Sequence, residues 1–466
     1  MARPRISTEP MTDNRLTGTE RRAAASLAGI FGLRMFGLFM LYPVFASYAR
    51  ALPGASPALI GVALGIYGLT QAGLQLPFGL ASDRLGRKGV ITLGLVLFVI
   101  GSVIAGFAPD IGWMILGRAV QGAGAVGAAT LALTADLTRV EQRGKAIGII
   151  GIGMGLAFGL ALVAGPVVNA WLGLAGIFWL TAALGLAGLV VLWAAVPTPR
   201  VVRRHRDTEP VPAQIGRVLR DGRLVRLYGS IFALHAMLVA LFLAIPLLLS
   251  GVSTIEPRNQ WMFYLPVLAV GLLLILPLVI YAESRGRLKP VALGAIATLA
   301  AAALALGFMP GGLWPLAVVL AAFFAALTLM ETLLPSLVTR LARPEAKGTA
   351  LGVYSTSQFL GIFVGGALGG WIHGRFGIPG VCVFVAAVGV LWFALFATLR
   401  PPRALASRAF AVAVRDETDG QRLAAQLEAV AGVEEAVVFA DEGTASLRVD
   451  RSRLDEAALT RVIAGD

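Results

Sequence analysis

The chain has 466 residues, of which 57% are apolar and only 14% are charged, and its mean hydropathy is +0.81. Soluble proteins average about 45–50% apolar and about 25% charged residues, so this composition argues against a soluble multidomain enzyme and against a disordered chain. The formal net charge is +13, which would suggest a nucleic-acid partner in a soluble protein. A single cysteine, Cys382, excludes a disulfide framework and a cysteine-based metal cluster.

The chain opens with a polar, arginine-containing segment of 22 residues. The apolar run that follows is too long for the core of a signal peptide, which is about 7–15 residues, and is predicted to be a first membrane helix. Further apolar runs long enough to span a membrane bring the predicted total to twelve helices. The predicted spans are 23–48, 58–81, 89–107, 111–135, 146–169, 174–196, 226–250, 261–283, 289–309, 314–338, 349–373 and 377–399.

Lysine and arginine are concentrated in alternate connections. The loops after predicted helices 2, 4, 6, 8 and 10 hold twenty of them, whereas the loops after the odd-numbered helices hold three, Arg50, Arg258 and Arg375. The positive-inside rule then places both termini of a multi-pass protein of the bacterial inner membrane in the cytoplasm. The basic charge is therefore interpreted as a topology signal in contact with the lipid bilayer, and no nucleic-acid partner is expected.

The longest inner loop, residues 197–225, divides the predicted helices into an N-terminal bundle (23–196) and a C-terminal bundle (226–399). This linker is predicted to be partly helical near 213–220. It either lies on the anionic leaflet or is a solvated connector. Residues 1–22 are predicted to be a cytoplasmic segment.

The charge balance and the apolar content change near the C-terminus of the chain. Residues 400–466 hold nine arginines and twelve acids and no long apolar run. Their alternation and helical spacing predict a cytoplasmic β-α-β-β-α domain over 405–466, with its first strand at 410–414. This order is that of a ferredoxin-like fold without its last strand. Because no cysteines stand in the first loop, at 415–420, metal transfer is not expected. The alternative role for this domain is to bind a regulatory ligand or partner.

Two inner loops share a pattern two hundred positions apart. An acidic residue, a glycine and an arginine recur at the same spacing in the loops 79–88 and 283–289. The match implies an internal duplication of a six-helix unit. Parallel repeats of this kind place the substrate near the midplane between two halves that rock.

Three motifs resemble the major facilitator superfamily. The loop Gly79–Lys88 resembles its signature loop, and residues 117–124 (GRAVQGAG) resemble its helix-4 motif, common in proton-linked exporters. Gly165-Pro166 resembles the helix-5 antiporter motif, although Val-Val-Asn at 167–169 replaces the expected glycines. The added terminal domain narrows the resemblance to YajR-type bacterial inner-membrane exporters.

The resemblance implies a conformational latch at the inner loop between the second and third helices. Arginine can bridge two carboxylates through its planar fork, and Arg87 lies between Asp83 and Asp136 in the sequence. Asp83 is also placed to face the positive N-terminal end of the helix predicted at 349–373. The alternative is ordinary juxtamembrane charge. The predicted latch residues are Gly79, Asp83, Arg84, Gly86, Arg87, Lys88 and Asp136.

Three charged residues lie well inside predicted membrane helices: Arg34, Arg118 and Glu331. Each costs roughly 2.5–3.5 kcal/mol or more at the bilayer centre, so each should face a cavity or a partner. Burial disfavours the charged form of a carboxyl, which makes Glu331 a proton site or else a structural ion pair. The resemblance implies a role in proton coupling for Arg118, with helix–helix contact as the alternative. His235 either relays protons or packs, and Arg34 either binds an anionic group or fixes the first helix.

Polar pairs one turn apart occur on two predicted helices. They either line a substrate cavity or form interhelical hydrogen bonds worth about 0.6 kcal/mol each. The predicted cavity residues are Arg34, Tyr67, Gln71, Gln121, Tyr354 and Gln358. Stripes of small residues predict close helix packing at Gly155, Gly159, Gly165, Pro166, Gly361 and Gly365.

These features favour a secondary transporter that exports a small amphiphilic or drug-like compound in exchange for protons, with a sugar or other metabolite as a less favoured substrate. The alternative class is a membrane sensor or scaffold that signals through its terminal domain, and a channel is a weaker third reading. The chain has no G-x-x-x-x-G-K-[ST] sequence, which argues against ATP as the driving force. The G-x-G-x-x-G match at 122–127 lies inside a predicted membrane helix, so neither a cofactor nor enzymatic activity is expected.

Overall fold

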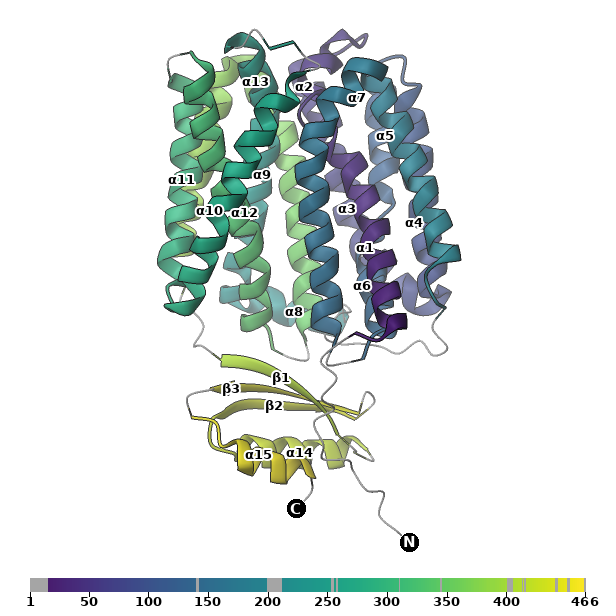
Figure 1. The fold of residues 1–466 in the computed structure, drawn as a ribbon, viewed down its shortest axis with the longest axis vertical. Coiled ribbons are helices and arrows are strands. Elements are labelled where there is room, and N and C mark those ends of the chain that lie inside the picture. The colour runs from purple at the N-terminus through teal and green to yellow at the C-terminus, as the bar shows by residue number, and fades with distance from the viewer. Residues whose placement is uncertain are drawn as a thin grey trace.

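A bundle of long helices stands above a small unit of three strands and two helices in the computed structural model (Figure 1). We call the end of the bundle beside the sheet the inner end, and the opposite end the far end. The structure describes all residues except 1–15, 140–141, 199–211, 253–254, 257–258, 310, 344–345, 400–404, 413, 415, 441–442, 451–452 and 465–466.

The first part of the bundle comes from residues before the long linker. Its elements are α1 (Gly18–Phe39), α2 (Phe45–Tyr48), the 3-10 helix η1 (Ala49–Ala51), α3 (Pro57–Leu85), α4 (Arg87–Gly106), α5 (Ile111–Ala123), α6 (Gly127–Asp136) and α7 (Arg143–Ala194). The second part follows the linker. Its elements are α8 (Pro212–Arg220), α9 (Gly222–Val252), α10 (Trp261–Ser284), α11 (Leu288–Phe308), α12 (Leu313–Leu341) and α13 (Lys347–Ala397).

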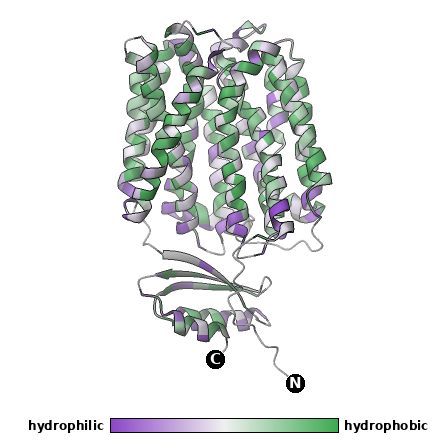
Figure 2. Ribbon diagram, viewed as in Figure 1, coloured by the Kyte–Doolittle hydropathy of each residue, from purple (hydrophilic) through white to green (hydrophobic). Residues whose placement is uncertain are grey.

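The bundle has the composition of a membrane domain. Within the described part of the chain, nine helices are long and apolar enough to cross a membrane. Helices satisfy all their backbone hydrogen bonds internally, which is what a segment in lipid requires. Figure 2 shows apolar residues along the helices and hydrophilic ones gathered at the inner end of the bundle.

Two of these helices are about twice the length needed to span a bilayer, which is about 20 residues. Helix α7 has 52 residues and contains a non-helical glycine, Gly173, with φ of +67°. Helix α13 has 51 residues and contains Gly377, with φ of +65°. A left-handed glycine breaks the helical path without steric cost, so each element consists of two helical segments that meet at the glycine. Both breaks fall where the sequence predicted a boundary between spans.

Two predicted spans differ from the structure. The span predicted at 111–135 is interrupted between α5 and α6, where the Gly124 carbonyl accepts a hydrogen bond from Arg34 instead of continuing the helical ladder. The span predicted at 23–48 ends as a regular helix at Phe39. Pro43 follows, and proline has no N–H to continue a helix.

The internal repeat is visible in side-chain geometry at the inner end. Lys88 Nζ donates a hydrogen bond of 2.6 Å to the carbonyl of Val196. Lys289 Nζ donates one of 2.6 Å to the carbonyl of Ala397. Donor and acceptor are 108 residues apart in both cases. The same bond at the same spacing is what duplication of one helical unit produces.

The two parts of the bundle meet most closely along α3 and α13. A Cβ added to Gly61 would overlap the carbonyl of Gly366, and one added to Gly65 would overlap the backbone of Phe363. Small residues that let two backbones touch are the usual basis of tight helix contacts in membranes. These contacts therefore hold the two parts together toward the far end.

The C-terminal unit follows the predicted element order. It consists of β1 (Leu405–Ala411), α14 (Glu417–Glu428), β2 (Val433–Phe439), β3 (Thr444–Asp450) and α15 (Glu456–Ala464). The strands form an antiparallel sheet in the order β1-β3-β2, and the sheet lies between its helices and the bundle (Figure 1). Leu427, Leu447 and Leu459 are buried in its core. The first strand begins five residues earlier than the predicted 410–414, because its pairing with β3 starts at Leu405.

Candidate transport site

Arg34 is the centre of a polar cluster inside the first part of the bundle. It lies on α1, is 1% exposed, and its Nη2 donates to Tyr67 Oη (2.6 Å), Gln71 Oε1 (2.7 Å) and the Gly124 carbonyl (2.9 Å). Tyr67 and Gln71 sit one turn apart on α3, so both reach the same guanidinium. The structure thus brings together three of the predicted cavity residues, all enclosed by neighbouring helices.

A second arginine, Arg118 on α5, is equally buried. Its Nε and Nη2 donate to the carbonyls of Ala63 and Leu64, each at 3.3 Å, and its Nη1 donates to Gln121 Oε1. Gln121 in turn donates to Ser102 Oγ at 2.8 Å. The sequence placed Gln121 in the cavity, but its amide is fully used inside the first part of the bundle.

Both guanidinium groups are held by neutral partners. They flank the ring of Tyr67, at 5.8 Å for Arg34 and 5.1 Å for Arg118. Among the described residues no carboxylate pairs with either arginine, and Nε and Nη1 of Arg34 are buried without a hydrogen-bond partner. Burying unpaired charge is costly, so this region is electrostatically suited to an approaching negative group.

The second part of the bundle holds a different cluster. His235 on α9 is enclosed, and its Nε2 lies 3.2 Å from Glu331 Oε1 on α12 and 2.8 Å from Gln358 Nε2 on α13. Its Nδ1 lies 3.3 Å from the carbonyl of Ile231, one turn earlier on α9. The Glu331 side chain keeps 28% of its surface exposed. The predicted proton residues Glu331 and His235 are therefore in direct contact, and one of them is accessible.

The two clusters lie on either side of the contact between α3 and α13. The ring of Tyr67 meets that of Phe359 edge-on, with centroids 6.4 Å apart, and Phe359 follows Gln358 in the chain. The hydroxyl of Tyr354, one turn before Gln358, is buried without a hydrogen-bond partner among the described residues. An unpaired hydroxyl beside a polar cluster is a candidate ligand contact.

The inner loop between α3 and α4 forms part of the predicted latch. Arg87 Nε lies 3.1 Å from Asp136 Oδ2, with both side chains fully enclosed, and its Nη1 donates to Ser82 Oγ at 2.8 Å. Gly86 makes the turn with φ of +85°. Arg84 is exposed, and the Gly79 carbonyl accepts from Ser82. The side chain of Asp83 lies outside the described part of the structure.

Comparison with known proteins places the chain in a family. The model of the Major Facilitator Superfamily matches residues 27–269 and 256–420. The chain belongs to the major facilitator superfamily. It is 39% identical over 440 residues to the inner membrane transport protein YajR of Escherichia coli, covering 94% of this chain and 96% of the relative.

Superfamily members of lower sequence identity also match the chain. The chain is 29% identical over 346 residues to the multidrug resistance protein MdtH of Aeromonas salmonicida, covering 73% of this chain and 85% of that protein. The solved structure of a bacterial homologue of the human lysosomal transporter Spinster matches with a TM-score of 0.66 at 16% identity, over 83% of this chain and 97% of its own. The resemblance inferred from the motifs is confirmed, and the chain is a membrane transport protein by family.

The sequence analysis missed a second ion pair, which lies beside the predicted latch. Arg139, three residues after Asp136, donates to the Glu20 carboxylate from its backbone N (2.9 Å), Nε (2.9 Å) and Nη2 (3.1 Å). Thr17 and Glu20 also form a capping box at the start of α1. The spacing T-x-x-E is a recognisable helix-start signal, so the position of Glu20 was accessible from the sequence. Its partner Arg139, in the loop between α6 and α7, was not.

The predicted glycine contacts are only partly present in the structure. Added Cβ atoms at Gly361 and Gly365 would overlap the α9 backbone, and one at Gly165, which precedes the buried Pro166, would overlap the Met40 carbonyl. By contrast, Cβ atoms at Gly155 and Gly159 would meet nothing within 4 Å. The packing prediction was wrong for those two, because a four-residue spacing defines a stripe but not the side of the helix that meets a neighbour.

Proposed function

We propose that this protein is a proton-coupled antiporter that exports small amphiphilic or drug-like compounds by alternating access. Membership of the superfamily and the 39% identity to an inner membrane transport protein support transport. Similarity to proteins named for multidrug resistance supports efflux of such compounds. The small number of charges between the two polar clusters favours amphiphiles over highly charged substrates.

The proposed architecture has twelve spans in two halves, 23–196 and 226–399. It follows from dividing α7 and α13 at their glycine breaks and from treating α5 with α6 as one interrupted span. The inner end, rich in lysine and arginine, is the cytoplasmic side by the positive-inside rule, which places both termini in the cytoplasm. The terminal unit of 405–466 is then a cytoplasmic domain of ferredoxin-like type that binds a regulatory ligand or partner.

The contact of Glu331 with His235 is the observation that carries the proton-coupling proposal. When Nδ1–H of His235 donates to the Ile231 carbonyl and the Gln358 amide donates to Nε2, the imidazole is neutral. Glu331 Oε1 then lies 3.2 Å from His235 Nε2, whose lone pair already accepts the hydrogen bond from Gln358. A carboxylate is repelled there, whereas a protonated carboxyl is not. Glu331 is therefore the group that holds a proton in this conformation and releases it in another.

The predicted latch residues and Arg118 have supporting roles in this proposal. The pair of Arg87 and Asp136 forms the latch at the inner rim, with Asp83 as the third member that engages the other half. Arg118 holds its helix beside Tyr67, so that movement of this helix reaches the interface at Phe359. Substrate binds between the halves, within reach of Tyr354 and Gln358.

Proteoliposomes with an imposed pH gradient test this proposal. Fluorescent cationic, neutral and anionic dyes of similar size are the probes. We expect gradient-driven flux of at least one dye, reduced at least tenfold in Glu331→Gln, while dye exchange without a gradient persists. Glu256→Gln, at an acid in the loop between α9 and α10, is the matched control and should retain flux. Undiminished gradient-driven flux in both Glu331→Gln and Arg118→Ala would overturn the proton assignment.

Deletion of 405–466 separates transport from the sensor alternative. A transporter keeps measurable dye flux without this unit, because the substrate path lies in the membrane bundle. Complete loss of flux in a folded, correctly inserted truncated protein would instead favour a sensor or scaffold whose output is the terminal domain.

A further inference from the structure

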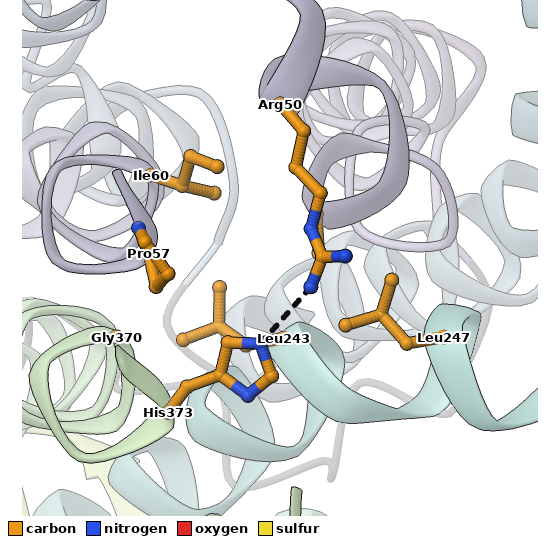
Figure 3. A pocket seen from close by; sticks show the side chains of 8 residues that line it. Arg50, Pro57, Ile60, Leu243, Leu247, Gly370 and His373 are labelled. Carbon is orange, nitrogen blue, oxygen red and sulfur yellow. Dashed lines mark hydrogen bonds between the residues drawn. The ribbon is translucent and has the colours of Figure 1, made fainter. Parts of the chain in front are cut away.

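A small pocket at the far end of the bundle is built equally from both halves. Figure 3 shows the Arg50 side chain reaching from the first half toward the imidazole of His373 in the second. The residues that line the pocket are Ala46, Arg50, Pro57 and Ile60 from the first half, and Leu243, Leu247, Gly370 and His373 from the second.

The polar contact in this pocket requires a neutral histidine. Arg50 Nη2 lies 3.0 Å from His373 Nε2. Since a guanidinium can only donate hydrogen bonds, Nε2 must accept and therefore carries no proton. The other ring nitrogen, Nδ1, is buried and has no hydrogen-bond partner among the described residues. Apart from the nearby backbone of Gly377, nothing in the described part of this pocket would compensate a positive charge on the imidazole.

The pair sits where the halves are in closest contact. Gly370, one turn before His373, has its backbone against Pro57 and Gly61 of α3, so that an added Cβ would overlap both. Arg50 is held in η1, the short element that leads into α3. Separating the halves at the far end must therefore pull Arg50 away from His373.

The surroundings offer no counter-charge. Among the described lining residues, Arg50 and His373 are the titratable groups, and α3 and α9 contribute only apolar side chains. On the elements that carry the pair, Tyr48 of α2 is a neutral phenol, and Arg375 stacks on the Trp371 ring at 5.6 Å. Protonation of His373 would place two positive charges about 3 Å apart with no carboxylate in the pocket, and such a contact is repulsive.

We propose that Arg50 and His373 form a proton-sensitive lock on the far end of the transporter. The lock holds the halves together while His373 is neutral and releases them when His373 gains a proton from the far side. This site is distinct from Glu331 and rests on the alternating access proposed above. A proton gradient that is acid on the far side would thus favour opening toward that side, where an exported compound leaves.

Distance measurements between spin labels at the far end test the lock. Trp113 at the start of α5 and Trp314 at the start of α12 are 50% and 81% exposed, and neither contacts the pocket. Both are replaced by cysteine in a Cys382→Ala background, and the labelled protein is studied in liposomes at pH 8 and pH 5.5. We expect the long-distance fraction to rise at least threefold at pH 5.5.

Three variants decide whether His373 is responsible. His373→Gln offers Arg50 an amide oxygen that does not titrate, so the short distance should persist at both pH values. His373→Lys should give the long distance at both. Should His373→Lys fail to fold, Arg50→Met replaces it: with the repulsion removed, the pH response should disappear. A pH response that survives unchanged in His373→Gln would overturn the lock.

The same measurement separates this inference from the proposed function. A pH response lost in Glu331→Gln but retained in His373→Gln would refute the lock and leave proton-coupled transport standing. If instead no variant, pH or dye alters the distance distribution, alternating access itself is refuted.

Discussion

The two halves share a scaffold but differ in the chemistry placed on it. Arg34 in the first half and His235 in the second are 201 positions apart, the same offset as that between Lys88 and Lys289. Arg34 is bound by neutral hydrogen-bond acceptors of its own half, whereas His235 contacts an acid and an amide. A guanidinium keeps its charge at every accessible pH, but an imidazole–carboxyl pair does not. The equivalent positions therefore carry a fixed charge in the first half and, in the proposed function, a pair that responds to protons in the second half.

The comparison predicts that Arg118 in the first half is structural and that Glu331 in the second half is functional. Arg118→Met should lower the free energy of unfolding by about 3 kcal/mol, because it leaves two backbone carbonyls and the Gln121 amide without their donor. Glu331→Gln should cost less than about 1 kcal/mol, since the side chain is partly exposed and a neutral amide takes the place of a neutral carboxyl of similar shape. Thermal unfolding of both variants in one detergent measures the difference.

The outcome is informative in either direction. Equal destabilisation by the two substitutions would mean that both clusters are structural, and the division between the halves would be wrong. A loss of gradient-driven flux in Glu331→Gln without a change in stability would instead sharpen that division.

A second prediction concerns the contact that joins the halves. Gly61→Ala should destabilise the far-end contact by about 1–3 kcal/mol, because the new Cβ overlaps the backbone of Gly366. Gly73→Ala, on the same helix but with nothing within 4 Å of the new Cβ, is the matched control. It should be neutral or stabilising by up to about 1 kcal/mol. Cross-linking yield between the halves at the far end, together with thermal unfolding, reports the effect. Equal behaviour of the two variants would show that the halves are not joined through α3.

Much of this architecture is readable from the sequence because lipid imposes simple rules. Apolar length and the distribution of basic residues predicted the helices, and the repeated loop at 79–88 and 283–289 predicted the duplication. The break at Gly124 was not predictable, because it depends on a hydrogen bond from a residue ninety positions away. The same is true of the terminal unit, where the element order followed from local periodicity but the start of β1 depended on pairing with β3.

The candidate site was predicted as a set of residue types rather than as an arrangement. Charges deep in apolar helices signal function because they are costly there, which identified Arg34, Arg118 and Glu331. Their partners could not be deduced, since helix order in the bundle is not encoded in any single segment. For the same reason the pairing of Arg50 with His373 was not predicted. Arg50 lies in the short helix η1 and His373 lies in α13 just before the break at Gly377, and only the fold brings the two side chains to 3.0 Å.

The smallest expected effect tests the symmetry on which the comparison rests. Lys88→Met and Lys289→Met each remove one hydrogen bond to a carbonyl at the inner end, and each should cost about 1 kcal/mol. Lys88 also lies 5.3 Å from the centre of the Trp193 ring. Because that cation–π contact is removed as well, Lys88→Met should lower the free energy of unfolding by about 0.5–1 kcal/mol more than Lys289→Met. Since the two lysines lie in different halves, the double variant should show the sum of the single effects within about 0.5 kcal/mol. Trp193→Leu should abolish the excess at Lys88 and leave Lys289 unaffected. A marked departure from additivity would mean that the inner ends of the two halves are coupled directly, and the halves would then no longer be independent bodies that rock about their shared contact.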